Sequence, residues 1–235
     1  MYLCAFDAGL GDMRRGLEIA CRIGNRHGEM FALLSIGSCY VTAGRYAEAA
    51  DIPLQALEQA RALNARRYEA SGLGVCAELA LGQGNRREAL ALVREGLAAS
   101  EETSPRFVGP ILYGLLGLIE TERSAREAAL AASEALLAKG AGGHNHIWFR
   151  RYAIEAALQA GEWAEAECHA DALARRTAAE PLPLSDLIVE RGRILARMGR
   201  GTGRDDDAGK LAALRAKAAA ADFRIDALGD ALRAG

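Results

Sequence analysis

Several residue types that mark particular protein classes are scarce in this sequence of 235 residues. Only 6% of the residues are aromatic, and there are five prolines. Runs of valine, isoleucine and threonine, which favour β-strands, are missing. Alanine is abundant and 51% of the residues are hydrophobic, a composition that favours closely packed helices. We therefore expect an all-α fold.

The sequence also has little that would place it in a membrane, outside the cell or on nucleic acid. The five cysteines form no C-x-x-C pair and have irregular spacing, which is typical of a reduced chain. No apolar stretch approaches the length that crosses a membrane, and the N-terminal arginines follow the short apolar run instead of preceding it. The net charge of -2 favours neither nucleic acid nor an anionic membrane as partner. We expect a cytoplasmic protein.

No complete catalytic or metal-binding motif is present. His144 and His146 flank Asn145, but an acidic or cysteine ligand does not follow until Glu155, so a helix-capping loop is the preferred interpretation. Cys168 and His169 are adjacent on a predicted helix and point in different directions, which argues against a nucleophile and base couple. We therefore expect no enzyme activity and no cofactor.

A repeated pattern organises the chain. Residues 30–65 read as two antiparallel helices joined at a glycine, and the same turn position recurs every 33 to 40 residues. A small residue follows five positions after each turn except the last, which lets the second helix of a pair press against the first. The turn positions are Gly11, Gly44, Gly84, Arg123, Gly161 and Gly199.

These turns predict a single array of about five to six helix pairs over residues 1–235. The predicted first helices are 29–43, 66–82, 107–122, 145–160 and 184–198, and the predicted second helices are 46–63, 86–100, 125–139, 163–177 and 206–221. We expect Pro53 to kink the first of these second helices. At the ends we expect a partial first repeat over 1–28, with a turn at 9–12 and a helix from 13 to 23, and an amphipathic helix over about 222–233 that covers the open end.

The pattern resembles the tetratricopeptide repeat, with its Leu-Gly, Tyr, Gly-x-Tyr-x-x-Ala and Ala-Leu positions. The matching residues are Ile36, Gly37, Tyr40, Gly44, Tyr46, Ala49, Ala56 and Leu57. Residues 161–201 are also similar to the last part of the C-terminal helical arrays of large bacterial proteins that join a nucleotide-cyclase domain to an AAA-type ATPase, and related arrays follow the ATPase of some transcription regulators. This resemblance implies an alpha-alpha superhelix and an accessory region whose catalytic domains lie outside this chain.

The resemblance also implies which side chains face the concave groove of the superhelix, since fixed repeat positions line it. Aromatic residues bordered by arginines and carboxylates would grip a peptide or a small anionic effector. The alternative is a solvated groove in which these charges pair with one another. The implied residues are Phe31, Ser38, Glu78, Tyr113, Glu120, Trp148, Arg151, Glu155, Asp186, Arg193 and Arg197.

Two functions remain open from the sequence. The first is a non-catalytic scaffold that binds a protein or peptide segment, or the upstream domains of the same polypeptide. The second is a sensor in which a small effector controls a linked ATPase or nucleotide cyclase. A partial first repeat would leave Leu17 and Ile19 poorly covered, so we also expect that two copies can pair through the N-terminal end.

Overall fold

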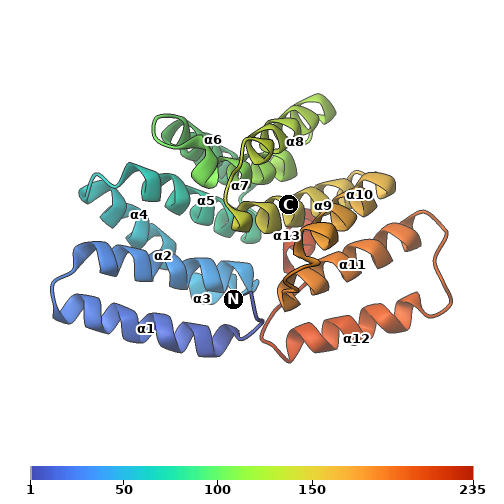
Figure 1. Cartoon of the computed structure of the whole chain (residues 1–235), viewed down its shortest axis with the longest axis horizontal. Coiled ribbons are helices and arrows are strands. Elements are labelled where there is room, and N and C mark those ends of the chain that lie inside the picture. The colour runs from blue at the N-terminus through green and yellow to red at the C-terminus, as the bar shows by residue number, and fades with distance from the viewer. Residues whose placement is uncertain (1, 235) are drawn as a thin grey trace.

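The computed structural model describes residues 2–234, and over these residues the chain consists of helices α1–α13 with no strand (Figure 1). This confirms the all-α prediction. The helices are α1 (Phe6–Arg22), α2 (Arg26–Thr42), α3 (Tyr46–Ala49), α4 (Ile52–Ala62), α5 (Arg66–Gly82), α6 (Arg86–Glu101), α7 (Pro105–Ile119), α8 (Arg123–Ala138), α9 (Gly143–Gln159), α10 (Trp163–Thr177), α11 (Pro183–Gly199), α12 (Asp207–Ala219) and α13 (Ala227–Ala234).

The helices pack in adjacent pairs that follow one another around the molecule. The first helix of each pair contacts the first helix of the following pair: α2 contacts α5, α5 contacts α7, α7 contacts α9, and α9 contacts α11. These five helices form an inner layer. The second helices α4, α6, α8, α10 and α12 pack on this layer from outside, and α1 packs on α2 (Figure 1). The structure is therefore an all-α helical-repeat fold with a regular progression from pair to pair.

Glycines in the left-handed region make several of the predicted turns. Gly44, Gly84 and Gly161 have φ values of 72°, 83° and 70°, a conformation that side chains with a Cβ rarely adopt. The fourth turn, before Arg123, uses extended backbone at Glu120 and Glu122 instead.

The predicted turn at residues 9–12 was wrong, because α1 runs unbroken from Phe6 to Arg22. The helix predicted from 13 to 23 is the C-terminal part of this longer helix. Phe6 and Leu10 are buried, and Met13 and Leu17 pack beside them at the spacing of one helical face. Burying this face outweighs the cost of a glycine inside a helix, about 1 kcal/mol. The first glycine in the left-handed region is Gly24, which follows α1.

Pro53 interrupts a helix, as its chemistry requires, but the interruption lies before it. The second helix of that pair is divided into α3 and α4 at Ala50, whose φ is 40°, and Pro53 sits in the first turn of α4, where no helical donor is needed. Its ring packs against α2 so closely that a Cβ at Gly37 would lie 2.9 Å from Pro53 Cγ.

The two ends of the chain meet, which the sequence analysis did not predict. Residues 222–234, here called the closing segment, lie beside the N-terminal helices: Phe223 stacks on Phe6 with ring centroids 5.6 Å apart, and both rings are buried. The Arg224 N–H donates to the Ala43 carbonyl over 2.9 Å. Within the segment, α13 packs against the inner helices α5 and α9, while Phe223, which precedes α13, covers Phe6 of the end helix α1.

The N-terminal residues add a second link between the ends. The Leu184 N–H, at the start of α11, donates to the Tyr2 carbonyl over 3.2 Å, and the Tyr2 ring lies 5.8 Å from that of Trp148. The array is thereby closed into a ring whose centre is filled by α13 from one side.

Two exposed apolar residues near the N-terminus, Ile19 and Ile23, line a further cavity of about 300 Å³ between α1 and α2. Ile19 and Ile23, on and just after α1, are 49% and 66% exposed, whereas Leu17 is partly covered by the core. Pairing of two copies through this edge stays a prediction.

The contact between the chain ends can be tested by truncating its ring. Phe223→Ala removes a buried phenyl group, so we expect it to lower the free energy of unfolding by about 3–5 kcal/mol. Phe31→Ala, the matched control on a residue that is 56% exposed, should cost less than about 1 kcal/mol. Urea denaturation followed by circular dichroism measures both, and equal costs would show that the closing segment contributes little.

Candidate functional site

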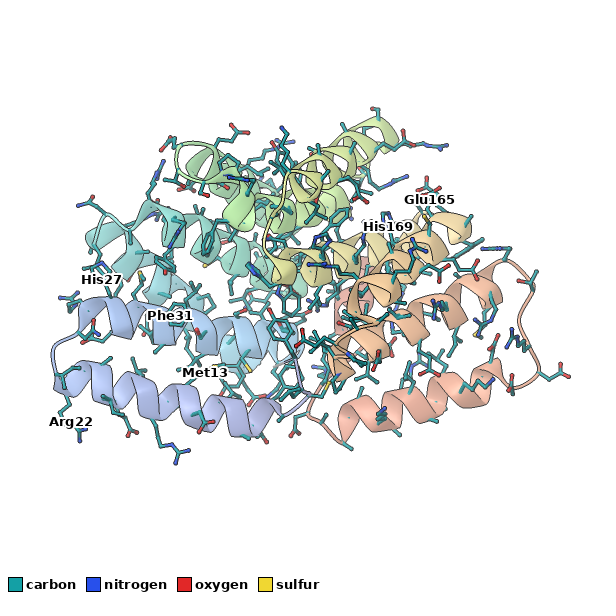
Figure 2. The ribbon with its side chains drawn as sticks, viewed as in Figure 1. Met13, Arg22, His27, Phe31, Glu165 and His169 are labelled. Carbon is teal, nitrogen blue, oxygen red and sulfur yellow. The ribbon has the colours of Figure 1, made fainter. Side chains whose placement is uncertain are left out.

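The inner layer of helices opens into a cavity of about 290 Å³. This is near the lower end of the range for small-ligand sites. Its walls come from α2, α5, α7 and α9, with Tyr2 and Met13 added from the N-terminal region. Figure 2 shows Met13 on α1 and Phe31 on α2, two of the residues at its edge.

Four ring-bearing residues form one wall of the cavity, here called the aromatic ladder: Phe31, Tyr68, Phe107 and His144. Each comes from a different inner helix, and consecutive ring centroids are 6.1, 6.1 and 6.4 Å apart in edge-to-face geometry. The rings therefore follow one another along the cavity wall in the same order as the inner helices that carry them. Partial burial lowers the pKa of His144, which favours its neutral form.

A buried asparagine fixes the last two rungs of the ladder relative to each other. Pro110 lies inside α7 and cannot donate to the carbonyl of Arg106, four residues earlier. The Asn145 side-chain amide, on α9, donates instead to the carbonyls of Arg106 and Phe107 over 3.4 and 3.1 Å. Because Asn145 follows His144 and bonds the carbonyls of Arg106 and Phe107, it holds Phe107 and His144 side by side.

The floor of the cavity is a buried ion pair. Glu78 accepts from Arg151 Nη1 over 2.7 Å and from the Tyr152 hydroxyl over 2.5 Å, so both carboxylate oxygens are engaged. Burial and the negative charge of Glu78 raise the pKa of Tyr152 and keep its hydroxyl protonated as a donor. The guanidinium of Arg151 also lies 5.8 Å from the Trp148 ring centroid.

Beyond this floor, a second buried network holds the closing segment. Glu155 accepts from Arg191, which also donates through Nε to Asp226 over 2.8 Å. A Cβ at Gly229 of α13 would lie 3.0 Å from a Glu155 carboxylate oxygen, so the helix approaches closely only because it has glycine there. Arg191 therefore links α9 and α11 to the closing segment.

The structure brings only some of the residues implied by the resemblance into one site. Phe31, Ser38, Glu78 and Trp148 line the cavity. Arg151 and Glu155 are buried in the ion pairs behind it, where they hold inner helices together.

The other implied residues lie elsewhere. The Tyr113 hydroxyl donates to Glu101, and Glu120 accepts from Arg94, both across the α6–α7 contact. Asp186, Arg193 and Arg197 line a separate cavity of about 470 Å³ between α10, α11 and α12. The two arginines there are already engaged, Arg193 by Asp171 and Arg197 by Asp207.

Sequence reasoning missed two rungs of the ladder, Tyr68 and Phe107, and assigned His144 to a capping loop. A signal for them exists. Tyr68 and Phe107 are the third residues of α5 and α7, and His144 is the second residue of α9. Counting from the starts of the inner helices, instead of from the turn glycines, places these three residues at equivalent positions, whereas Phe31 is the sixth residue of α2.

Neither a scan against protein-family models nor a search of curated proteins finds a match for this chain. Among the described helices, none is both long enough and apolar enough to cross a membrane. Residues 2–234 also hold no group of three or more potential metal ligands. What the structure shows is the class of protein: an all-α protein built of adjacent helix pairs, with an aromatic-lined cavity in its inner layer.

The role of Asn145 gives a test by a double-mutant cycle. Asn145→Ala leaves the Arg106 carbonyl without its donor and should lower the free energy of unfolding by about 1–3 kcal/mol. In a Pro110→Ala background, the substitution supplies a backbone N–H that bonds that carbonyl, so the loss of Asn145 should cost less by at least about 0.5 kcal/mol. Urea denaturation of the four proteins measures the coupling, and additive costs would contradict this account.

Proposed function

We propose that this chain is a non-catalytic, tetratricopeptide-like interaction module that binds a protein or peptide segment in the aromatic-lined cavity. In this proposal it is a cytoplasmic accessory region of a larger bacterial signalling protein, and its partner is another protein or an upstream domain of the same polypeptide. The observation that carries the proposal is the row of rings from four successive helices beside an open apolar cavity.

Recognition in this site is expected to be apolar. The buried charges near it are paired inside the protein, so they support the walls and leave little charge for a partner to meet. Rigid aromatic side chains in a preformed pocket supply much of the affinity in protein interfaces. A bulky apolar side chain of a partner would therefore be held by the ladder, Trp148 and the aliphatic residues between them.

The polar side chains at the floor of the cavity are also better suited to holding the inner helices together than to catalysis. Proton transfer needs a group whose pKa lies near the working pH. Tyr152 has its pKa raised well above the usual value of 10.0 and is committed to Glu78.

A display selection of linear peptides against the whole chain tests this proposal. Selected peptides should contain bulky apolar residues, and Tyr68→Ala should weaken their binding at least about tenfold, since truncating an aromatic anchor at the centre of a site costs about 2 kcal/mol or more. Tyr113→Ala is the matched control, because its ring lies outside the cavity. Isothermal titration calorimetry measures both. Equal losses, or binding insensitive to Tyr68, would reject the cavity as the site.

The sensor function has one observation in its favour. Tyr2 lines the cavity, and its carbonyl accepts a hydrogen bond from the start of α11. A small effector in the cavity would therefore contact a residue that joins the two ends of the helical array. Binding to the closed form alone would then stabilise it.

A thermal-shift screen of neutral aromatic and aliphatic compounds checks this alternative. A specific ligand at about 100 times its dissociation constant should raise the free energy of unfolding by about 2.7 kcal/mol, seen as a higher melting temperature. The shift should disappear in Tyr68→Ala and persist in Tyr113→Ala. A screen with no hit sensitive to Tyr68 would count against the sensor.

A further inference from the structure

The geometry of the ladder points to the conformation and chemistry of the bound segment, an inference that rests on the proposed function. We infer that the cavity takes an extended peptide segment with apolar side chains at every second residue and a carboxylate beside them. The spacing of the rings and an unpaired arginine next to them carry this inference.

The spacing of the rungs matches a strand. Consecutive rings are 6.1 to 6.4 Å apart, and side chains two residues apart in an extended chain are about 6.6 Å apart on the same face. One apolar side chain could therefore rest at each step of the ladder without a change of register over two or three steps.

A helical segment fits the same row less well. Side chains four residues apart on a helix have a similar rise, but each further step rotates the next one away from the row. A helix with its side chains is also about 10–12 Å wide, which is large for a cavity of about 290 Å³. An extended segment keeps all its contacts on one side and is narrower.

The charge beside the ladder is positive and unpaired. The Arg67 guanidinium lies 4.4 Å from the ring centroid of Phe107 and 5.4 Å from that of Tyr68, so the two rings fix its position. Its neighbour Arg66 is paired with Glu69 and Glu102, whereas Arg67 is exposed and has no carboxylate partner among residues 2–234. A pre-positioned guanidinium is a receptor for a carboxylate.

The remaining polar groups of the cavity suit a peptide backbone. An extended segment that pairs with no strand needs donors and acceptors for its own N–H and C=O groups. The hydroxyls of Ser38 and Thr42, on α2, line the cavity and offer both. The lining has no side chain with an unbalanced charge, because Glu78 is neutralised by Arg151. The occupant is therefore apolar inside the cavity and acidic at Arg67.

Three synthetic peptides test the inference on the full chain by isothermal titration calorimetry. The first has leucine at every second position and flanking aspartates, the second has the same composition with leucine at every third position, and the third replaces the aspartates by lysine. We expect the first to bind at least about tenfold more tightly than either control, because the second places one or more leucines off the row and the third meets Arg67 with like charge.

A pair of variants tests the role of Arg67. Arg67→Gln should weaken the first peptide about three- to tenfold and reduce the salt dependence of its binding. Arg87→Gln, on another exposed arginine outside the cavity, is the matched control and should change neither. Equal affinity of the first two peptides would overturn the extended conformation, and equal effects of the two variants would overturn the acidic partner.

Failure of this inference can be told apart from failure of the proposed function. If none of the three peptides binds while display-selected peptides bind in a manner that requires Tyr68, the cavity is a peptide site but not for this class of segment. If the selected peptides also bind independently of Tyr68, both proposals fall.

Discussion

The contact between Phe6 and Phe223 is the constraint on which the rest of the structure depends. A stack of helix pairs has two terminal faces, and each would expose apolar residues if it ended in solvent. Here the first helix and the closing segment cover one another, and the Tyr2 link to α11 reinforces the contact. Because the ends meet, the inner face of the array becomes the interior of a ring. The positions that would line an open groove are consequently divided between a filled side and an open cavity.

The closed arrangement of the helices explains why the buried charges inside it are paired. Glu78 with Arg151, and Glu155 with Arg191, lie inside the ring, where an unpaired charge would cost several kcal/mol. The first pair joins α5 to α9, the second joins the consecutive inner helices α9 and α11, and Asp226 ties the second pair to the closing segment. The first pair is at the same time the floor of the cavity. One set of interactions therefore holds α13 in place on one side and forms the floor of the cavity on the other.

The sequence predicts the parts of this fold that depend on local pattern. The predicted helices 66–82 and 163–177 have the same bounds as α5 and α10, since their apolar periodicity and turn glycines are both local signals. The ring closure leaves no such signal, because Phe6 and Phe223 lie at opposite ends of the chain. The same limit applies to the site: Glu78 and Arg151 were assigned to a groove as separate residues, and only the fold shows that they neutralise each other.

Closure also has a consequence for binding. In an open superhelix, neighbouring repeats can shift relative to one another, and a ligand that contacts several of them must hold them in one arrangement. In this closed array of helices, Asn145 bridges the last two rungs of the aromatic ladder. The first rung belongs to α2, whose C-terminal end accepts a hydrogen bond from the Arg224 backbone N–H. The aromatic side chains are thus positioned before any ligand binds, so the protein loses little conformational entropy on binding. In the proposed function, an apolar cavity of modest size binds selectively because the spacing of its aromatic rings is set by the fold and not by the ligand.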